Sequence, residues 1–227
     1  MDSNRLPGKA LMKVHGTPMV VRVAQQCSQA IGIENVIVST PDKAIFDISK
    51  EYGFKSIYSS IECKTGTDRL YEYILNSNEN LVFNVQGDEP MIAISVIQNF
   101  YNQVSKSGKS CIGIAPITKN EDIFNTNVVK VAVSDNKLIY ASRSPIATSS
   151  QNERVTYFKH TGLYSFSKQD LLLFGNSKPK ALEILEKIEI LRLIEIGLSV
   201  STVEIPNYGR SVDTLQDLNH INSLGDS

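Results

Sequence analysis

The sequence offers little that would tie the protein to a membrane or to nucleic acid. Its 23 basic residues are balanced by 24 acidic ones, so no global positive charge can hold a nucleic acid or an anionic membrane. No apolar run approaches the roughly 18 residues of a membrane-spanning helix. The opening residues, MDSNRLPGK, are polar and differ from the apolar core of a signal peptide. We therefore expect a cytoplasmic protein that binds no nucleic acid and inserts into no membrane.

Cysteine is scarce, and Cys27, Cys63 and Cys111 stand far apart in the sequence. An odd, scattered set argues against a disulfide framework and against a cysteine-rich zinc site. No Ser/His/Asp or Cys/His arrangement suggests a protein nucleophile. The chain also lacks internal repeats and any linker rich in Pro, Gly or Ser. We therefore expect one domain over residues 1–227, with 41% hydrophobic residues to fill its core.

Short apolar or β-branched runs alternate with helical patterns along the chain. The predicted strands cover 35–40, 55–58, 81–85, 111–115, 128–133, 138–141, 158–166 and 200–205. The predicted helices cover 41–52, 68–75, 94–104, 181–196 and the residues from 214 onward. This alternation predicts an α/β fold with a Rossmann-like, mostly parallel sheet flanked by helices. The strand-rich stretch at about 117–166 predicts a small antiparallel insertion.

The segment Gln86-Gly87-Asp88-Glu89-Pro90 follows the most apolar predicted strand, 81–85. Ligands of open α/β sheets bind beyond the carboxyl ends of the strands, which makes Asp88 the best-placed carboxylate. Mg²⁺ takes one or two carboxylates and completes its octahedron with water and phosphate oxygens. The same residues also suit a turn, with Asp88 as a helix cap and Gly87 at a tight bend. The pattern alone leaves a magnesium site and a simple turn open.

Two cations, Arg5 and Lys9, flank a Pro-Gly bend near the start of the sequence. Backbone N–H groups of such a loop can face phosphate oxygens while the two side chains neutralise charge. The segment lacks the spacing of a P-loop, which needs two glycines followed by Lys-Ser/Thr. A basic terminus without a ligand explains the same residues equally well.

A second glycine turn, Thr65-Gly66-Thr67-Asp68-Arg69, precedes a predicted helix. Its backbone donors and threonine hydroxyls can contact a base or a phosphate. An ordinary helix N-cap accounts for the same residues. The motif is compatible with nucleotide binding and does not require it.

Acidic residues recur at three-residue spacing in the predicted helix 181–196. They are Glu183, Glu186 and Glu189, followed by Arg192. Neighbours at this spacing lie on one helix face, so we expect a solvated row of ion pairs. The spacing alone gives no support to a sugar-binding role for Glu189. His160 lies in a predicted strand, where a hydrogen-bonded structural histidine is the commoner case.

Seven segments taken together resemble a known family. They are RLPGKAL, TGTDR, NVQGDEP, ASRSPI, KHTGLYSF, IEILR and SVDT, in this order along the chain. The same order occurs in the 3-deoxy-manno-octulosonate cytidylyltransferases, the CMP-KDO synthetases of lipopolysaccharide assembly. The resemblance covers nearly the whole chain, and the ordered set is far more specific than any one motif. It implies a Mg²⁺-dependent nucleotidyltransferase that binds CTP and an acidic sugar and forms a homodimer.

The resemblance also implies roles for individual residues. The loop around the CTP triphosphate is matched by Arg5, Gly8 and Lys9, and the segment near cytosine and ribose by Thr65, Gly66 and Arg69. Gln86 matches a nucleotide contact, and the two magnesium ligands are matched by Asp88 and Asp213. The positions around the acidic sugar are matched by Arg143, His160, Tyr164 and Glu189. The catalytic residues implied in this way are Lys9, Asp88 and Asp213.

Two positions depart from the family's pattern. The family commonly has Ser where Thr65 stands, and Glu-Gln-Leu-Arg where this chain has IEILR with Ile190 in place of the glutamine. An amide that could hydrogen-bond the sugar is thus replaced by an apolar side chain. We expect either an altered sugar or a weaker affinity for the standard octulosonate, which Ile190→Gln should improve. A loss after that change would mean that Ile190 is a packing residue.

The resemblance implies that CTP and a 3-deoxy-2-ulosonic acid give the CMP-sugar and pyrophosphate. The anomeric hydroxyl attacks the α-phosphorus in line, with Mg²⁺ on Asp88 and Asp213 reducing charge repulsion. Lys9 and Arg5 stabilise charge on the β and γ phosphates. Arg143 can meet the sugar carboxylate as a bidentate fork. Two alternatives stay open: a sister cytidylyltransferase for an amino-substituted ulosonate or a phosphonate, and a nucleotide-binding protein without catalysis.

Family members begin with an apolar strand and a Pro-Ala-Arg segment ahead of the RLPGK loop, whereas Met1 stands directly before this loop here. Such a strand normally lies at the centre of a doubly wound sheet, and its loss would expose two rows of backbone polar groups. We therefore expect the coding sequence to begin further upstream. In-frame codons for an apolar run ending in Pro-Ala-Arg would bear this out. An upstream in-frame stop, with full activity of the 227-residue chain, would refute it.

Overall fold

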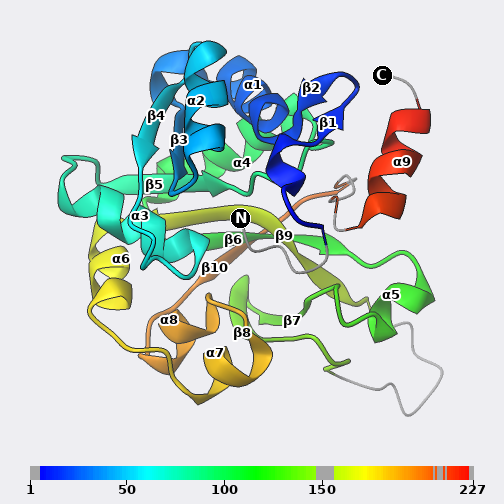
Figure 1. Ribbon diagram of the computed structural model, residues 1–227. Coiled ribbons are helices and arrows are strands. Elements are labelled where there is room, and N and C mark those ends of the chain that lie inside the picture. Colours follow the sequence, from blue (N-terminus) through cyan, green and yellow to red (C-terminus); the bar gives the residue numbers. More distant parts are fainter. Residues whose placement is uncertain (1–5, 147–155, 207, 209–211, 213, 225–227) are drawn as a thin grey trace. The chain divides into compact units, whose positions relative to one another are not determined.

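The computed structural model describes residues 6–146, 156–206, 208, 212 and 214–224 (Figure 1). The chain forms two compact units. Unit 1 comprises Met1–Glu72, Val85–Tyr101 and Tyr208–Ser227, and unit 2 comprises Tyr73–Asn84 and Asn102–Asn207. Two predicted site residues, Arg5 and Asp213, lie outside the described residues. One domain with an insertion at about 117–166 stays a prediction.

Unit 1 contains a parallel strand pair joined by a helix. β3 (Ile37–Thr40) pairs with β4 (Lys55–Tyr58), and α2 (Lys43–Glu51) lies between them in the chain and contacts both. Asp42 caps α2, because its carboxylate accepts the backbone N–H groups of Ala44 and Ile45 at 2.8 and 3.2 Å. The predicted strand–helix–strand sequence is confirmed here.

Helix α1 (Met19–Ile31) has no counterpart among the predicted helices. It begins after Pro18 without a side-chain cap, so its start gives no N-cap signal in the sequence. Gly32 ends it with φ 87°, a left-handed conformation that glycine adopts without strain. The helix buries six of its side chains, and Met19, Val23 and Cys27 among them lie on one face. Short helices η1 (Lys9–Leu11) and η2 (Ile33–Asn35) flank this region.

The two ends of the described chain meet in the core of unit 1. The hairpin of β1 (Lys13–Val14) and β2 (Thr17–Pro18) lies beside α9 (Leu215–Ser223) in Figure 1. The shared apolar cluster is formed by Leu6, Val14, Met19, Val212, Leu218 and Ile221. Thr214 begins α9 with a capping box, in which its hydroxyl and the Asp217 carboxylate exchange hydrogen bonds with backbone N–H groups. The predicted last helix is confirmed.

Unit 2 contains a six-stranded sheet in the order β5-β9-β6-β10-β8-β7. Its strands are β5 (Leu81–Val85), β6 (Cys111–Pro116), β7 (Lys130–Ser134), β8 (Lys137–Ser142), β9 (Phe158–Ser167) and β10 (Ser201–Glu204). β10 runs parallel to β6, whereas the pairs β6–β9, β7–β8, β8–β10 and β7–β9 are antiparallel. The predicted strands all form and the α/β class is confirmed, but the prediction of a mostly parallel sheet is wrong for this unit, because four of its described strand pairs are antiparallel.

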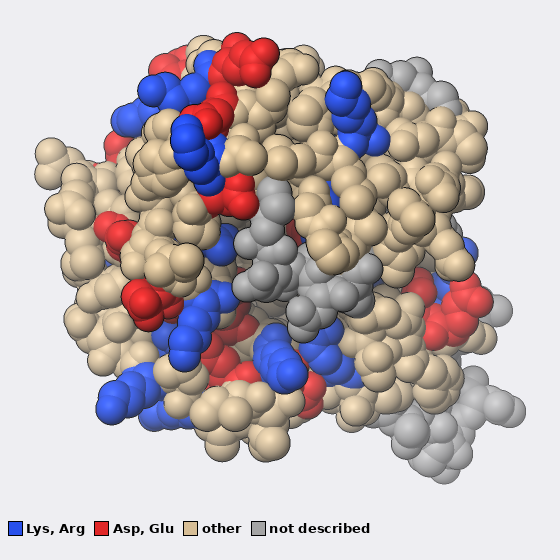
Figure 2. Space-filling model, in the orientation of Figure 1, with Lys and Arg blue, Asp and Glu red and all other residues tan. Residues whose placement is uncertain are grey.

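Two helices, α3 (Gly66–Leu75) and α4 (Ile94–Ser107), begin in unit 1 and end in unit 2. The remaining helices of unit 2 are α5 (Asn120–Phe124), α6 (Lys168–Gly175), α7 (Ala181–Glu186) and α8 (Leu191–Glu195). α6 contacts β9, and α8 contacts β8. Among the described residues, none of the helices has the length and hydropathy needed to cross a bilayer. Figure 2 shows basic and acidic side chains intermixed on one face, in keeping with the near-neutral net charge.

The prediction of one helix over 181–196 is wrong. The chain leaves α7 at Lys187, which has the left-handed φ of 55°, and starts again at α8. Four apolar side chains of this stretch are buried, namely Ile188, Ile190, Leu191 and Leu193. At 100° per residue, one continuous helix would spread these four around its whole circumference, so it could not bury them on one face. Breaking the helix allows all four to reach the core.

Because the helix breaks at Lys187, Glu183, Glu186 and Glu189 do not lie on one helix face. The predicted solvated row of ion pairs therefore does not form. Glu183 instead makes a buried bidentate pair with Arg192, with distances of 2.6 Å from Nε to Oε2 and 2.5 Å from Nη2 to Oε1. The two side chains are only 8% and 5% exposed. The guanidinium of Arg192 also lies over the Phe174 ring, 3.8 Å from its centroid.

The three cysteines are free thiols, as the sequence predicts. Cys27 and Cys111 are buried, and Cys63 is half-buried near Glu72, whose carboxylate lies 3.4 Å from the sulfur. No disulfide therefore contributes to the stability of either unit.

We predict that Glu183→Gln destabilises the protein by about 3 kcal/mol, because it leaves a buried guanidinium without its counter-charge. The control is Asp47→Asn, which breaks the exposed pair with Lys43 and should cost far less stability. Urea unfolding followed by circular dichroism measures both changes. Equal losses in the two variants would contradict a stabilising buried pair.

Candidate active site

Three segments of unit 1 meet at the ammonium group of Lys9. Its Nζ lies 2.6 Å from Oδ2 of Asp88, in the loop after β5, and 3.1 Å from the carbonyl oxygen of Val212. Val212 in turn donates its N–H to the carbonyl oxygen of Asp88 at 3.1 Å. The Lys9 and Asp88 side chains are 15% and 28% exposed, so a ligand can still reach them. The structure thus joins two of the predicted catalytic residues.

Gly8 shapes the loop that presents Lys9. It has φ 72° and ψ 12°, the left-handed conformation that favours glycine. Its carbonyl accepts the N–H of Leu11 at 3.0 Å, which starts the short helix η1 at Lys9. A side chain at Gly8 would strain this bend and move the ammonium group, so the predicted phosphate loop has a structural need for its glycine.

The surroundings of Asp88 fit a magnesium ion that is completed by a ligand. The carboxylate already faces a cation, the ammonium of Lys9, and keeps part of its surface exposed. Within the described part of the chain, no group of three or more His, Cys, Asp or Glu side chains could hold a metal. Mg²⁺ commonly needs only one or two protein carboxylates when phosphate oxygens and water supply the rest. Asp88 can supply one of these.

The turn at Thr65 is a helix cap, and its arginine has an unsatisfied donor. Thr65 Oγ1 accepts the N–H of Asp68 at 3.1 Å, and the Asp68 carboxylate accepts the N–H of Thr65 at 2.9 Å. This reciprocal pair is a capping box at the start of α3. Nε of Arg69 is buried without a hydrogen-bond partner among the described residues. A buried guanidinium donor without a partner is costly, and a bound ligand would satisfy it.

Two of the predicted sugar-site residues lie on one face of β9. His160 and Tyr164 are four residues apart in the strand, and their ring centroids lie 4.7 Å apart in an edge contact. Burial lowers the pKa of His160 to about 4, so its imidazole is neutral near pH 7. Its Nε2 is buried and has no hydrogen-bond partner among the described residues. Nε2 is therefore left for a ligand, and a hydrogen-bonded imidazole ring stays a prediction.

Arg143 is held through both its main chain and its side chain. Its N–H donates to Oε2 of Glu186 at 2.9 Å, and its Nε donates to the Glu186 carbonyl oxygen at 3.0 Å. Its Nη1 donates to the carbonyl oxygen of Thr126 at 3.0 Å. Its own carbonyl oxygen accepts from Nζ of Lys130. Among the described residues Nη2 has no hydrogen-bond partner, so one corner of the guanidinium is available.

One segment, residues 125–130, ties Arg143 to the histidine strand. Lys130 is only 1% exposed, and its Nζ also donates to the carbonyl oxygens of Asn125 at 2.8 Å and Val128 at 2.7 Å. His160 donates its N–H to the Val129 carbonyl oxygen at 2.9 Å. Burial lowers the pKa of Lys130, and the positive charge of Arg143 lowers it further.

Sequence reasoning did not assign these roles to Lys130 and Glu186. A lysine within the apolar run 128–133 is the signal that could have marked a buried ammonium group. Nothing in the sequence indicates which carbonyl groups accept hydrogen bonds from this ammonium group. For Glu186 the assumption of one continuous helix pointed the carboxylate towards solvent.

Comparison with known proteins decides the family. The sequence pattern of the cytidylyltransferase family matches residues 1–204. A relative from Elusimicrobium minutum, named 3-deoxy-manno-octulosonate cytidylyltransferase, is 34% identical over 96% of this chain and 91% of its own length. A relative of the same name from Flavobacterium johnsoniae is 34% identical over 98% and 93%. The chain belongs to the 3-deoxy-manno-octulosonate cytidylyltransferase family.

Solved structures agree with this family. A CMP:2-keto-3-deoxy-manno-octonic acid synthetase solved in complex with CTP is 30% identical and matches with a TM-score of 0.88, over 97% of this chain and 92% of its own. The inositol-1-phosphate CTP transferase from T. maritima matches at 14% identity with a TM-score of 0.64, over 98% and 91%. The second likeness shows the fold alone. The Rossmann-like α/β class predicted from the sequence is confirmed.

The residues matched to the 3-deoxy-manno-octulosonate cytidylyltransferases divide between the two units. The described nucleotide and metal residues all lie in unit 1: Gly8, Lys9, Thr65, Gly66, Arg69, Gln86 and Asp88. The sugar residues all lie in unit 2: Arg143, His160, Tyr164 and Glu189. Each unit therefore carries the residues matched to one substrate.

Ile190 corrects an expectation drawn from the family pattern. Its side chain is only 1% exposed, so it packs in the core of unit 2 and presents no surface to a sugar. Its neighbour Glu189 lies in the turn between α7 and α8, where its carbonyl oxygen accepts the N–H of Arg192 at 3.1 Å. The difference at Ile190 therefore gives no reason to expect another sugar.

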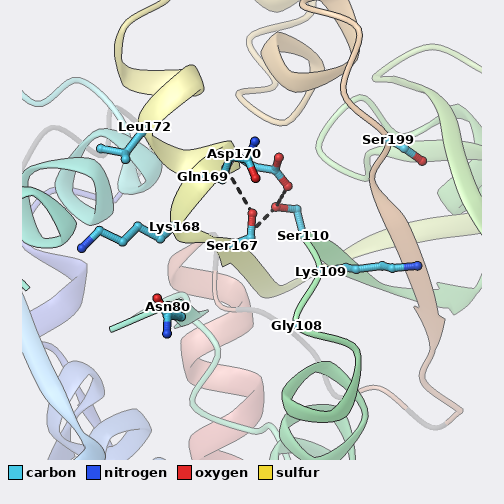
Figure 3. Close-up of a pocket in the computed structure, with 10 residues that line it drawn as sticks. All are labelled: Asn80, Gly108, Lys109, Ser110, Ser167, Lys168, Gln169, Asp170, Leu172 and Ser199. Atoms are coloured by element: carbon cyan, nitrogen blue, oxygen red, sulfur yellow. Dashed lines mark hydrogen bonds between the residues drawn. The ribbon is translucent and has the colours of Figure 1, made fainter. Parts of the chain in front are cut away.

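A cavity of about 560 Å³ in unit 2 lies apart from the matched residues (Figure 3). Its lining includes Ser110, Ser167 and Asp170, which are linked by hydrogen bonds such as the 2.6 Å contact from Ser110 Oγ to Asp170 Oδ2. Lys109 and Lys168 point away from each other, and Nζ of Lys168 donates to the carbonyl oxygen of Ser77. None of the residues matched to the family lines it.

We predict that Ile190→Gln destabilises the protein by about 1–3 kcal/mol, because it buries an amide at a position surrounded by apolar side chains. Thermal unfolding measures the change, with Ile139→Gln on the exposed face of β8 as the matched control. An unchanged stability, together with better use of the octulosonate, would show that Ile190 belongs to the sugar site.

Proposed function

We propose that the protein transfers the cytidylyl group of CTP to the anomeric hydroxyl of 3-deoxy-manno-octulosonate, for lipopolysaccharide synthesis. The hydroxyl oxygen forms a bond to the α-phosphorus as the bond to the leaving pyrophosphate breaks, and one proton is released. The contact between Lys9 and Asp88 carries this proposal, because it places a cation and a carboxylate together beside a glycine bend. The homodimer and the cytoplasmic location implied by the resemblance belong to the same proposal.

Lys9 provides positive charge for the triphosphate. Its ammonium group is fixed before CTP arrives by Asp88 and by the Val212 carbonyl group, so little reorganisation is needed when phosphate oxygens approach. Arg5 is proposed to add a second cation to the same loop. Arg69, whose buried Nε has no hydrogen-bond partner among the described residues, is proposed to donate to the nucleotide.

Asp88 and Asp213 are proposed to hold Mg²⁺. When bound, the ion would reduce the repulsion between the incoming hydroxyl and the phosphates and would orient the phosphate oxygens. The partial exposure of Asp88 supports this role, since a metal that shares ligands with CTP must be reached from solvent.

The sugar is proposed to bind through Arg143, His160, Tyr164 and Glu189. Nη2 of the Arg143 guanidinium, which has no partner in the described part of the chain, suits the sugar carboxylate, and charge-assisted hydrogen bonds of this kind are strong. The neutral imidazole of His160 can exchange a hydrogen bond with a sugar hydroxyl through Nε2. The core position of Ile190 removes the sequence-based reason to prefer an amino-substituted sugar.

We predict that the protein releases pyrophosphate when it is incubated with CTP, Mg²⁺ and 3-deoxy-manno-octulosonate, and that Asp88→Asn lowers kcat at least about 100-fold. Loss of a metal ligand removes several kcal/mol of charge stabilisation, and each 1.36 kcal/mol is about tenfold in rate. The control is Asp135→Asn in the β7–β8 turn, where the same loss of charge should leave the rate unchanged.

A coupled pyrophosphate assay measures both variants at limiting and at saturating Mg²⁺. A wild-type rate for Asp88→Asn at limiting Mg²⁺ would contradict the assignment of Asp88 as a metal ligand. Binding of CTP without pyrophosphate release on any acidic sugar would favour a nucleotide-binding protein without catalysis.

A further inference from the structure

We propose that Glu186 is a positioning residue that fixes the guanidinium of Arg143 for an acidic substrate. This inference rests on the proposed function only where Arg143 meets the sugar carboxylate. Glu186 itself is assigned no contact with the substrate. It lies at the end of α7, whereas Arg143 directly follows β8, and the two residues are 43 positions apart in the sequence.

The carboxylate of Glu186 accepts hydrogen bonds from three residues at and just after the end of β8. Oε1 accepts from the Tyr140 hydroxyl at 3.0 Å and from Ser142 Oγ at 2.7 Å. Oε2 accepts the N–H of Arg143 at 2.9 Å, and the main-chain carbonyl of Glu186 accepts from Arg143 Nε at 3.0 Å. The one residue therefore sets both the backbone of Arg143 and the direction of its side chain.

The charge of Glu186 is part of this arrangement. Burial favours a higher pKa, but hydrogen bonds from Arg143, Ser142 and Tyr140 and the positive charge of Arg143 outweigh it and hold the pKa below its usual value. The group is therefore an ionised, acceptor-only carboxylate at neutral pH. The hydrogen-bond donors around the carboxylate all point towards it, and the carboxylate is the counter-charge of the guanidinium beside it.

The remaining contacts of Arg143 restrict the guanidinium from the other side. Nη1 donates to the Thr126 carbonyl oxygen, and the Arg143 carbonyl oxygen accepts from the buried Lys130. With Nε and Nη1 engaged, the rotation of the planar group is limited, while Nη2 has no partner among the described residues. A guanidinium ordered before binding loses less entropy when it meets a carboxylate, which raises affinity.

A purely structural role would have a different signature. If Glu186 only joined α7 to β8 through Tyr140 and Ser142, its loss would lower stability and leave the KM values for the two substrates in the same ratio. If it positions Arg143, its loss raises KM for the acidic sugar and leaves KM for CTP unchanged, because the described CTP-matched residues lie in unit 1.

The test compares Glu186→Gln with the matched control Glu195→Gln. The Glu195 carboxylate accepts the N–H groups of Leu182 and Glu183 at 2.8 and 3.1 Å, at the start of the same helix, and among the described residues it makes no hydrogen bond with Arg143. In Glu186→Gln the negative charge beside the guanidinium is lost, and an amide N–H group takes the place of one acceptor oxygen. We expect KM for 3-deoxy-manno-octulosonate to rise roughly 10- to 100-fold in this variant only, with KM for CTP within about twofold.

A double-mutant cycle with Arg143→Ala shows whether Glu186 acts through the arginine. In the Arg143→Ala background, Glu186→Gln should raise KM for the sugar no further. Equal effects with and without the arginine would overturn the proposal. Circular dichroism and urea unfolding identify any variant whose fold is lost, and Glu186→Asp provides a conservative second variant.

A second readout is independent of turnover. The main-chain N–H signal of Arg143 in ¹H–¹⁵N spectra, identified by its shift in Arg143→Lys, should exchange with solvent about tenfold or more faster in Glu186→Ala than in wild type, because it donates to the Oε2 atom that this variant lacks. Unchanged exchange would overturn the proposal even in a protein that shows no activity. A wild-type protein that releases no pyrophosphate would contradict the proposed function alone.

Discussion

A buried ammonium group organises the strand-rich part of unit 2. Burying a charge costs several kcal/mol unless it is fully hydrogen-bonded, so the Nζ of Lys130 requires its three acceptors. These acceptors are main-chain carbonyl groups of Asn125, Val128 and Arg143, which no sequence change can remove. The residues matched to the sugar site, Arg143 and His160, are anchored to the same short segment. The position of these two matched residues thus follows from the solvation of one charge.

Unit 1 uses the same chemical group for a different purpose. The ammonium of Lys9 is partly exposed and faces a carboxylate, Asp88, besides the main-chain carbonyl of Val212. A partly buried pair that solvent still reaches can exchange one partner for a phosphate oxygen, whereas the enclosed Lys130 cannot. The first lysine is therefore suited to bind a ligand, and the second to hold the protein together.

Local patterns predicted the elements that depend on neighbouring residues. β4 forms over the predicted Lys55–Tyr58, and α2 begins within two residues of the predicted start at 41, because alternation and capping are local properties. Helix α1 has no side-chain cap and was missed, and the break at Lys187 depends on burying apolar side chains in a core that the sequence does not display. The candidate site followed from a family resemblance, whereas contacts such as Glu186 with Arg143 join residues too far apart for any local pattern.

The three free cysteines are poorly reactive near neutral pH. Burial raises the pKa of Cys27 and of Cys111 to about 12, and burial with the nearby Glu72 carboxylate raises that of Cys63 to about 11. Because the thiolate is the reactive form, all three sulfurs are poor nucleophiles near pH 7. A cysteine introduced at an exposed position would therefore react first with a maleimide reagent. Fluorescent or spin labels could be attached at chosen positions without removing the native thiols.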